Sequence, residues 1–284
     1  MSSPDAGTAA VVGGGTMGAG IAYVLAAAGT ATTVVEPDAG RADRLVGELT
    51  ARARTGVERG RVDPGVAEAL PGLLRVVGAV AELPTGLDLV VESVPEDPEL
   101  KARVLAAAEA RAPRLLATNT SSVGIGSLAA GLAAPDRFLG MHFFNPVWSI
   151  ALVEVVRGPA TSDDAVAAAR DHATRIGKES IVVADVPGFA TSRLDNIAAF
   201  EAMRMLEEGV ASAEDIDRAA VLAYGHPIGP LRLSDVVGLD VRLDIARHLE
   251  SVYGERYAAP AILRRLVGEG RLGRKTGRGF FHWT

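Results

Sequence analysis

The segment Gly13-Gly14-Gly15-Thr16-Met17-Gly18 decides the fold of this 284-residue chain. It follows the apolar run Ala9–Val12 and opens an alanine-rich helical pattern over Met17–Ala28. A second apolar run comes next and ends at Glu36. A G-x-G-x-x-G segment between a strand and a helix, with an acidic residue about twenty positions on, is typical of dinucleotide-binding domains. The sequence therefore predicts a Rossmann-type domain at the N-terminal end.

The residues of this segment have separate tasks in such a domain. Gly13 permits the tight turn, Gly15 lets the backbone approach a pyrophosphate, and Gly18 lets the helix pack closely on the strand. The pyrophosphate would lie at the helix N-terminus, where N–H groups and the helix dipole favour anions. We therefore expect Thr16 and Met17, in the first helical turn, to complete the cofactor-binding turn.

The cofactor is indicated by Glu36 at the end of the second strand. Its carboxylate would accept hydrogen bonds from the adenosine ribose and would repel a 2′-phosphate, which favours NAD over NADP. Arg41 lies near enough in sequence to leave NADP open. The glycine segment alone also fits FAD.

Short apolar runs alternate with helical patterns through the first two thirds of the chain. Such alternation predicts an α/β fold with a doubly wound parallel sheet. From Pro187 onward helical patterns dominate, which predicts a second, smaller all-α domain, so we place the domains at 1–186 and 187–284. The predicted strands are Ala9–Val12, Thr32–Val35, Leu73–Val77, Leu87–Val94 and Leu115–Thr118, followed by Phe138–Phe144, Leu152–Val156 and the strand-like run Ser180–Val183.

Composition excludes several classes of function. The chain has no cysteine, so disulfides, thiolate nucleophiles and thiolate metal sites are ruled out. Its net charge of −6 argues against a nucleic-acid partner. No apolar run approaches the roughly 20 residues needed to span a membrane, and no calcium-loop spacing occurs. We expect a cytoplasmic protein without a metal.

The most informative residues for chemistry are Gly140–Pro146, which contain His142, and the apolar run Leu152–Val156, which contains Glu154. A histidine on an apolar strand needs a partner or a purpose. A carboxylate bonded to one imidazole nitrogen fixes the tautomer and stabilises the imidazolium formed when the ring takes a proton. The sequence predicts His142 as a general base and leaves open whether Glu154 touches it.

These segments together resemble the 3-hydroxyacyl-CoA dehydrogenase family, including bacterial 3-hydroxybutyryl-CoA dehydrogenases. The resemblance extends from about Ala9 to Phe281. The matching segments, in order, are Gly13–Ala22, Glu92–Lys101, Asn119–Ser122, Gly140–Pro146, Pro187–Phe189, Tyr224–Pro230 and Lys275–Gly277.

The resemblance implies reversible, NAD-dependent oxidation of a (3S)-3-hydroxyacyl-CoA to the 3-ketoacyl-CoA by a homodimer. In it, His142 is the general base, Glu154 orients the base, and Ser121 hydrogen-bonds the substrate oxygen and borders the cofactor. The other residues that the resemblance assigns to the cofactor are Glu96, Lys101, Asn119, Asn145 and Lys275.

Two regions of the sequence leave the identity of the substrate undecided. Ser192 stands where many family members carry an asparagine, and we still expect it to help hold the substrate. The segment Trp148-Ser149-Ile150-Ala151 departs from the Met-Lys that relatives often have directly before the run that corresponds to Leu152–Val156. These departures admit a carrier-protein-bound hydroxyacyl group or a small hydroxy acid as substrate. A catalytically silent NAD-binding protein is a further alternative.

Arginines cluster between positions 41 and 61 in a predicted helical region. With Glu48 and Glu58 among them, they could form a solvated helix face. Alternatively, Arg52 and Arg59 would bind the phosphates of coenzyme A, since arginine binds phosphate well.

Overall fold

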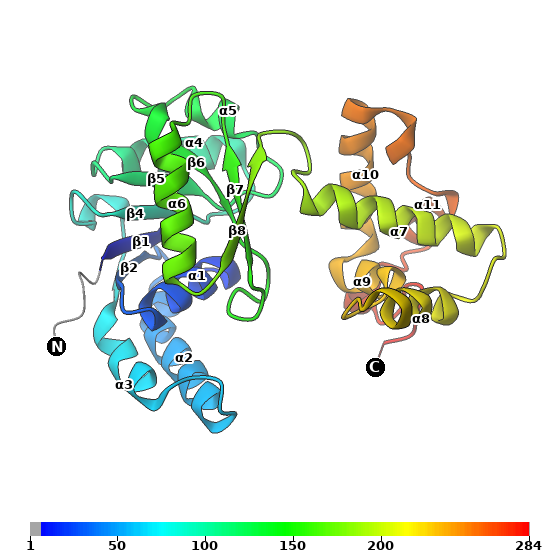
Figure 1. Ribbon diagram of the computed structural model, residues 1–284, viewed down its shortest axis with the longest axis horizontal. Helices are drawn as coiled ribbons and strands as arrows, with labels where there is room; N and C mark the ends of the chain where they lie inside the picture. The colour runs from blue at the N-terminus through cyan, green and yellow to red at the C-terminus, as the bar shows by residue number, and fades with distance from the viewer. Residues whose placement is uncertain (1–6, 284) are drawn as a thin grey trace. The chain divides into compact units, whose positions relative to one another are not determined.

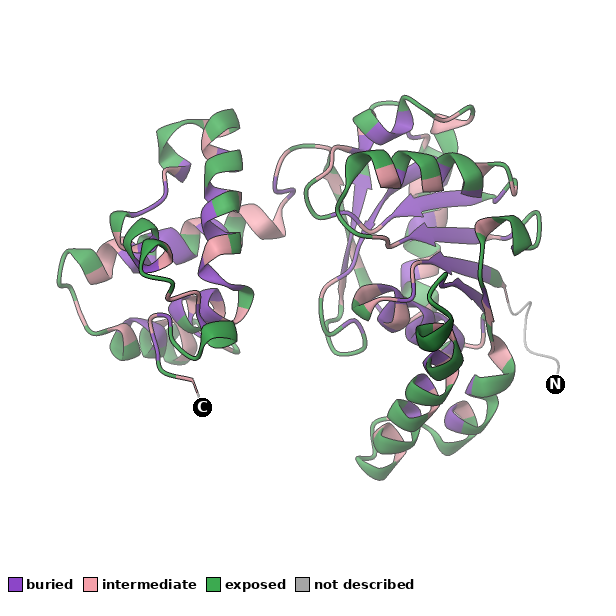
Figure 2. Cartoon of the chain, turned by 180° about the vertical axis from the view of Figure 1, so that it is seen from behind, coloured by how far each residue is buried: buried purple, intermediate pink, exposed green. Residues whose placement is uncertain are grey.

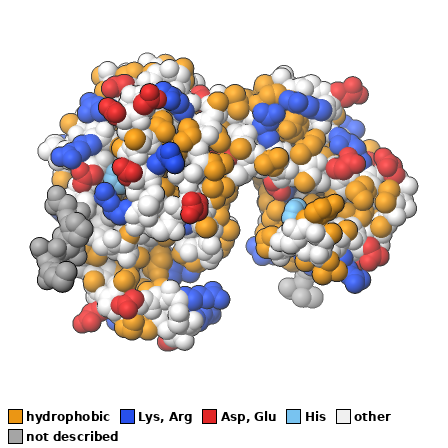
Figure 3. Space-filling view, in the orientation of Figure 1, with side chains coloured by type: hydrophobic (Ala, Val, Ile, Leu, Met, Phe, Trp, Pro, Cys, Tyr) orange, Lys and Arg blue, Asp and Glu red, His pale blue; other side chains and the backbone are white. Residues whose placement is uncertain are grey.

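The computed structural model describes residues 7–283. By its internal contacts the chain divides into two compact units, with the break between Val186 and Pro187. In the described part of the chain no helix is long and apolar enough to cross a membrane. On the face seen in Figure 3, acidic and basic side chains are interspersed on each unit, and that face shows no continuous basic surface.

The first unit is built on one sheet of eight strands in the order β3-β2-β1-β4-β5-β6-β7-β8 (Figure 1). Every neighbouring pair is parallel except β6 with β7. The strands are β1 (Thr8–Val12), β2 (Ala31–Val35), β3 (Leu74–Val77), β4 (Leu89–Glu92), β5 (Leu115–Thr118), β6 (Phe138–His142), β7 (Leu152–Arg157) and β8 (Glu179–Ala184).

Helices cover both faces of this sheet, which explains why its central strands are apolar throughout. Residues of α1, α2 and α6 share one buried core with alternate residues of the strands, while α4 contacts β4 and β5. Figure 2 shows the central strands as buried. The helices are α1 (Thr16–Ala27), α2 (Ala39–Glu58), α3 (Pro64–Leu73), α4 (Pro98–Glu109), α5 (Ile125–Ala129) and α6 (Asp163–Arg175), with short 3₁₀ turns η1 (Val80–Glu82) and η2 (Pro135–Arg137).

The β6–β7 pair departs from the parallel arrangement of the other neighbouring strands. Only nine residues separate His142 from Leu152 and they form no helix, whereas a parallel crossover needs a dozen or more residues. The chain therefore turns back on itself and β7 runs antiparallel to β6. This pairing places His142 directly opposite Glu154.

The second unit is helical, as predicted, with the core residues Phe200, Met203, Leu231 and Leu243 fully or almost fully buried. Its first helix starts at Thr191 rather than near Pro187, because Gly188 and Phe189 have positive φ angles of 76° and 43° that no α-helix accepts. The elements are α7 (Thr191–Glu207), α8 (Ala213–Tyr224), α9 (Pro230–Val237), α10 (Leu239–Tyr253), η3 (Glu255–Tyr257), α11 (Ala261–Gly268) and η4 (Arg274–Thr276).

Two buried charged groups organise this helical unit. The Asp235 carboxylate accepts hydrogen bonds from the backbone N–H groups of Phe280 and Phe281, each at 2.9 Å, and so fixes the C-terminal segment. Arg242, only 1% exposed, forms an ion pair with Asp195 on α7. The fold class is thus the predicted one, a Rossmann-type sheet domain followed by a smaller all-α unit.

Candidate active site

The ends of four neighbouring strands form one edge of the sheet. The glycine turn follows β1, Val94 follows β4, Asn119 follows β5 and Phe143 follows β6. Between β2 and β4 the strand order reverses around β1, and ligands of doubly wound sheets bind at such switch points. The sequence-predicted cofactor turn and the end of β6, where His142 lies, therefore belong to the same edge.

The glycine turn is built for a ligand that approaches the backbone. Gly13 has φ +107°, and a Cβ there would lie 2.6 Å from the Ser93 carbonyl oxygen. A Cβ on Gly18 would lie 1.8 Å from the Gly13 carbonyl oxygen, so both positions require glycine. At Gly15 nothing lies within 4 Å of the added Cβ, and no side chain caps the start of α1. This open, uncapped helix N-terminus, which begins at Thr16 and Met17, fits a pyrophosphate.

Glu36 lies beside this turn and is already held in place. Its carboxylate accepts hydrogen bonds from the N–H groups of Gly14 at 3.1 Å and Asp38 at 2.9 Å. Arg41 forms an ion pair with it at 3.1 Å. The arginine that kept NADP open in the sequence is thus paired with the carboxylate, and the pairing supports a cofactor that lacks the 2′-phosphate.

Lys101 lies deeper than the sequence suggested. It is fully buried on α4, and its Nζ contacts Glu92 Oε1 at 3.0 Å and Glu96 Oε2 at 3.1 Å. Glu92 is also fully buried and accepts a 2.6 Å hydrogen bond from the Thr118 hydroxyl. Lys101 therefore neutralises two carboxylates under the strand ends, and its direct contact with a cofactor stays a prediction.

Glu96 organises the segment that follows β5. Its Oε1 accepts hydrogen bonds from the Thr120 hydroxyl at 2.5 Å and from the backbone N–H groups of Ser121 and Ser122 at 3.0 Å. Partial burial opposes ionisation of this carboxyl, but the hydrogen bonds from Thr120 and Ser122 and the charge of Lys101 outweigh it and lower the pKa to about 2. Glu96 thus stays an anion that fixes the backbone of Ser121.

Asn119 connects three of the strand ends. Its Oδ1 accepts a hydrogen bond from the Phe143 N–H at 2.9 Å, and its Nδ2 donates to the Ser93 hydroxyl at 3.3 Å. These bonds tie the end of β5 to the segments that follow β6 and β4. Asn119 therefore positions the edge on which a cofactor would lie.

His142 and Glu154 do meet. Nδ1 of His142 lies 2.8 Å from Oε2 of Glu154, and the two residues are 7% and 0% exposed. The Phe144 ring packs against the imidazole at a centroid distance of 4.5 Å. An imidazole held this way can take a proton while the charge that forms on it is stabilised by a buried carboxylate.

Three predicted residues lie outside this arrangement of buried contacts. Asn145 is exposed on the loop after β6. Ser192, in the first turn of α7, and Lys275, in η4, belong to the helical unit. Lys275 pairs with Asp240 at 2.6 Å. The roles of these three residues toward cofactor and substrate stay predictions.

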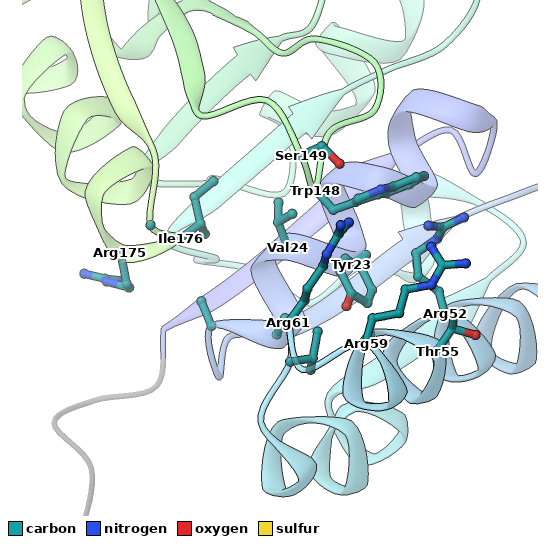
Figure 4. A pocket seen from close by; sticks show the side chains of 15 residues that line it. Tyr23, Val24, Arg52, Thr55, Arg59, Arg61, Trp148, Ser149, Arg175 and Ile176 are labelled. Carbon is teal, nitrogen blue, oxygen red and sulfur yellow. The ribbon is translucent and has the colours of Figure 1, made fainter. Parts of the chain in front are cut away.

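A cavity of about 830 Å³ opens elsewhere on the first unit (Figure 4). It lies between α1, the second half of α2, the β6–β7 loop and the turn after α6. Four arginines line it: Arg52, Arg59, Arg61 and Arg175. The guanidinium carbon of Arg52 lies 3.4 Å from the centre of the Trp148 ring, and Tyr23 meets the same ring edge-on at 6.4 Å. The two arginines singled out from the sequence therefore border one cavity.

Several residues of the cavity could not be recognised from the sequence. Arg175 closes a helix 114 positions after Arg61, and Tyr23 looks like any apolar position of α1. Burial raises the pKa of the Tyr23 hydroxyl, and the nearby positive charge of Arg52 partly offsets this. Arg52 and Arg59, expected to bind phosphate, and Trp148, noted as a departure, are the lining residues to which the sequence drew attention.

Comparison with known proteins places this site in a family. Residues 8–186 match the family model of the 3-hydroxyacyl-CoA dehydrogenase NAD binding domain, and residues 188–283 match the model of the C-terminal domain. The chain belongs to the 3-hydroxyacyl-CoA dehydrogenase family. The resemblance inferred from the sequence is confirmed, as is NAD as the cofactor.

Members of the 3-hydroxyacyl-CoA dehydrogenase family align along almost the whole chain. A 3-hydroxybutyryl-CoA dehydrogenase of Mycobacterium tuberculosis is 40% identical, and the alignment covers 95% of this chain and 96% of the relative. The crystal structure of (S)-3-hydroxybutyryl-CoA dehydrogenase from Ralstonia eutropha superposes with a TM-score of 0.92 at 34% identity, covering 99% of this chain and all of the other. A diketoreductase structure matches with a TM-score of 0.82 at 27% identity, covering 99% of this chain and all of the other.

Proposed function

We propose that the protein catalyses the reversible, NAD-dependent oxidation of a (3S)-3-hydroxyacyl-CoA to the 3-ketoacyl-CoA. The buried His142–Glu154 pair, 2.8 Å apart at the end of the catalytic strand, is the observation that carries this proposal. The NAD binding domain supports the cofactor. The names of the relatives, which include a 3-hydroxyadipyl-CoA dehydrogenase of Escherichia coli, support the substrate class.

The geometry of the pair indicates which nitrogen of His142 would take the proton. Glu154 accepts the hydrogen bond at Nδ1, so Nε2 of His142 is the nitrogen that takes the proton from the substrate 3-hydroxyl. NAD, when bound, supplies the acceptor for the hydride that leaves C3, the substrate carbon that bears this hydroxyl. Ser121, fixed through its backbone by Glu96, donates a hydrogen bond to the reacting oxygen. Asn145 would contact the nicotinamide end of NAD.

The arginine-lined cavity supports coenzyme A as the carrier of the acyl group. Its volume of about 830 Å³ lies in the range of small-molecule sites. Arg52 and Arg59 would bind the phosphates of the nucleotide part, which carrier proteins do not present. Replacing both arginines by alanine should raise the KM for an acyl-CoA and leave the KM for the same acyl group on a carrier protein unchanged.

The direct test is reduction of acetoacetyl-CoA by NADH, followed through the nicotinamide absorbance. We expect turnover in the wild type and a loss of at least about 10²-fold in kcat for His142→Gln, since a general base contributes that much. If no acyl-CoA is reduced, the proposed function is wrong. NADH binding without turnover of any substrate would instead favour the catalytically silent alternative.

A second candidate is reduction of a small dicarbonyl compound that lacks a thioester. The match with a diketoreductase and the substitutions at Ser192 and Trp148 favour it. Comparing free acetoacetate with acetoacetyl-CoA separates the two. Under the first proposal the CoA thioester is reduced with the higher kcat/KM, and Ser192→Asn increases that value because a longer amide reaches the substrate more directly.

We also propose a homodimer that forms through the helical unit. The apolar residues Ala199, Ala202 and Met203 of α7 are buried inside the unit's own core and are not available to a partner subunit. Other apolar side chains of this unit are exposed, among them Leu194 at 69% and Leu222 at 75%. Measurement of the molar mass in solution tests the assembly, and a monomer at micromolar concentration would contradict it.

A further inference from the structure

Lys178 is a buried lysine with an uncommon set of partners. It is 8% exposed and directly precedes β8. Its Nζ donates a hydrogen bond to the Val147 carbonyl at 2.6 Å and another to the Ile150 carbonyl. Both carbonyls belong to the β6–β7 loop, residues 143–151. Burial lowers the pKa of the Lys178 ammonium, which means that desolvation of this charge opposes folding.

The same loop is packed against α1 from another side. Val147 is 1% exposed, and a Cβ added to Gly20 of α1 would lie 2.8 Å from Val147 Cγ2. Glycine at position 20 therefore lets the loop approach the helix closely. Between the Gly20 backbone and the Lys178 ammonium, Val147 has little freedom to move.

The next residue along the loop, Trp148, forms part of the wall of the arginine-lined cavity. Trp148 is 36% exposed, stacks under Arg52 and meets Tyr23 edge-on. Figure 4 shows its ring at the cavity, near Arg52 and Tyr23. The position of this ring is set by the backbone of Val147, which is the group that Lys178 holds.

An apolar side chain of similar length would fill the space of Lys178 without the desolvation cost. It would, however, leave the Val147 and Ile150 carbonyls without this donor, and a buried acceptor that loses its donor is costly. The Lys178 ammonium therefore serves the backbone of the loop as well as filling space. Two hydrogen bonds from one ammonium fix both ends of the turn Val147–Ile150, which a methionine cannot do.

We propose that Lys178 is a positioning residue for the coenzyme A end of the substrate. It holds the β6–β7 loop against α1 so that Trp148 keeps Arg52 in place at the cavity. This role rests on the proposed function, because the cavity matters for catalysis only if it binds the nucleotide part of an acyl-CoA. Lys178 touches neither the reacting atoms nor His142 in this proposal.

The test compares two thioesters of the same acyl group. Acetoacetyl-CoA carries the nucleotide, whereas acetoacetyl-N-acetylcysteamine lacks it. For Lys178→Met we expect the KM for acetoacetyl-CoA to rise about tenfold, with kcat and the KM for the truncated thioester within twofold of wild type. Lys178→Arg, which keeps two donors, should recover most of the loss. Arg170→Met, an exposed change of the same charge on α6, serves as the control.

Other outcomes would overturn the role. Equal increases in KM for both thioesters, or a fall in kcat for both, would show that Lys178 supports the catalytic strands generally. Unchanged kinetics with acetoacetyl-CoA would show that the loop does not need it. If Lys178→Met does not fold, Gly20→Ala pushes the same loop from α1, and the same selective rise in KM is expected; a rise for both thioesters or for neither contradicts the proposal.

A measurement without substrate separates this role from the proposed function. The chain has two tryptophans, so in a Trp283→Phe background all tryptophan fluorescence, selected by excitation beyond the tyrosine absorption, comes from Trp148. Lys178→Met in that background should increase quenching of Trp148 by acrylamide at least twofold. If the wild type reduces neither thioester, the proposed function fails, while unchanged quenching would overturn the role of Lys178 by itself.

Discussion

Glu154→Gln would remove the negative charge that lies behind His142. Glu154 is fully buried, and its Oε2 lies 2.8 Å from Nδ1 of the imidazole. Glutamine has nearly the same shape, and with its amide oxygen toward Nδ1 it keeps this hydrogen bond and the tautomer of His142, so that the loss measures the charge alone. With its amide N–H group toward Nδ1 instead, the ring proton would lie on Nε2 and kcat would fall further.

The size of the effect follows from the distance between the charges. With the contact atoms 2.8 Å apart, the centres of imidazolium and carboxylate charge are separated by about 4 Å. At an effective dielectric constant of about 20 their attraction is about 4 kcal/mol, and about half of that if the proton is half transferred in the transition state. Losses of about 2 to 4 kcal/mol correspond to a kcat about 30-fold to 900-fold lower.

The assay is steady-state reduction of acetoacetyl-CoA by NADH, with kcat and KM measured separately. We expect the KM to change by less than about threefold, because Glu154 is shielded from the substrate by His142. His142→Gln and the variant with both substitutions complete a double-mutant cycle. Since Glu154 acts through His142, adding Glu154→Gln to His142→Gln should cost little more. A kcat for Glu154→Gln within threefold of wild type, or the same loss in both backgrounds, would refute this account.

Three further predictions concern cofactor choice and stability. Glu36→Ser should lower the preference of kcat/KM for NADH over NADPH at least tenfold, because Arg41 loses its partner; an unchanged ratio would contradict this. Asp195→Leu should lower the free energy of unfolding in urea by about 3 kcal/mol, since it leaves the buried Arg242 guanidinium without a carboxylate partner, whereas Arg242→Met should cost less than about 1 kcal/mol. Glu96 has its pKa lowered from 4.5 to about 2, so it stabilises the fold above about pH 4.5, and this contribution is lost as the pH falls toward 2. The difference in melting temperature between wild type and Glu96→Gln should therefore shrink over that interval, and a constant difference would count against the assignment.

Local signals in the sequence were sufficient for the architecture of the first unit. The glycine segment after an apolar strand, with Glu36 at the end of the next strand, is a pattern that few other folds produce. The direction of β7 could not be predicted in the same way, because an apolar run has no orientation of its own. The length of the loop before it was the available clue.

The site was predictable as a set of residues and not as a set of contacts. His142 and Glu154 could be named, but their contact depends on the register between two strands, which periodicity does not fix. Lys101 looks in sequence like any lysine on a helix, and only the fold shows that it is buried between two carboxylates. Lys178 gives no signal at all, since its partners are backbone carbonyls.

The nine-residue loop between β6 and β7 makes the enzyme sensitive to changes of length, because Lys178 and the packing on Gly20 hold Val147 in its middle. A residue added or removed between His142 and Val147 therefore strains the end of β6, and a one-residue slip turns each side chain of a strand to the other face of the sheet. His142 would then meet the valine on either side of Glu154. Libraries that vary the residues of this loop at constant length should therefore yield active variants, whereas insertions and deletions should be nearly absent among the survivors.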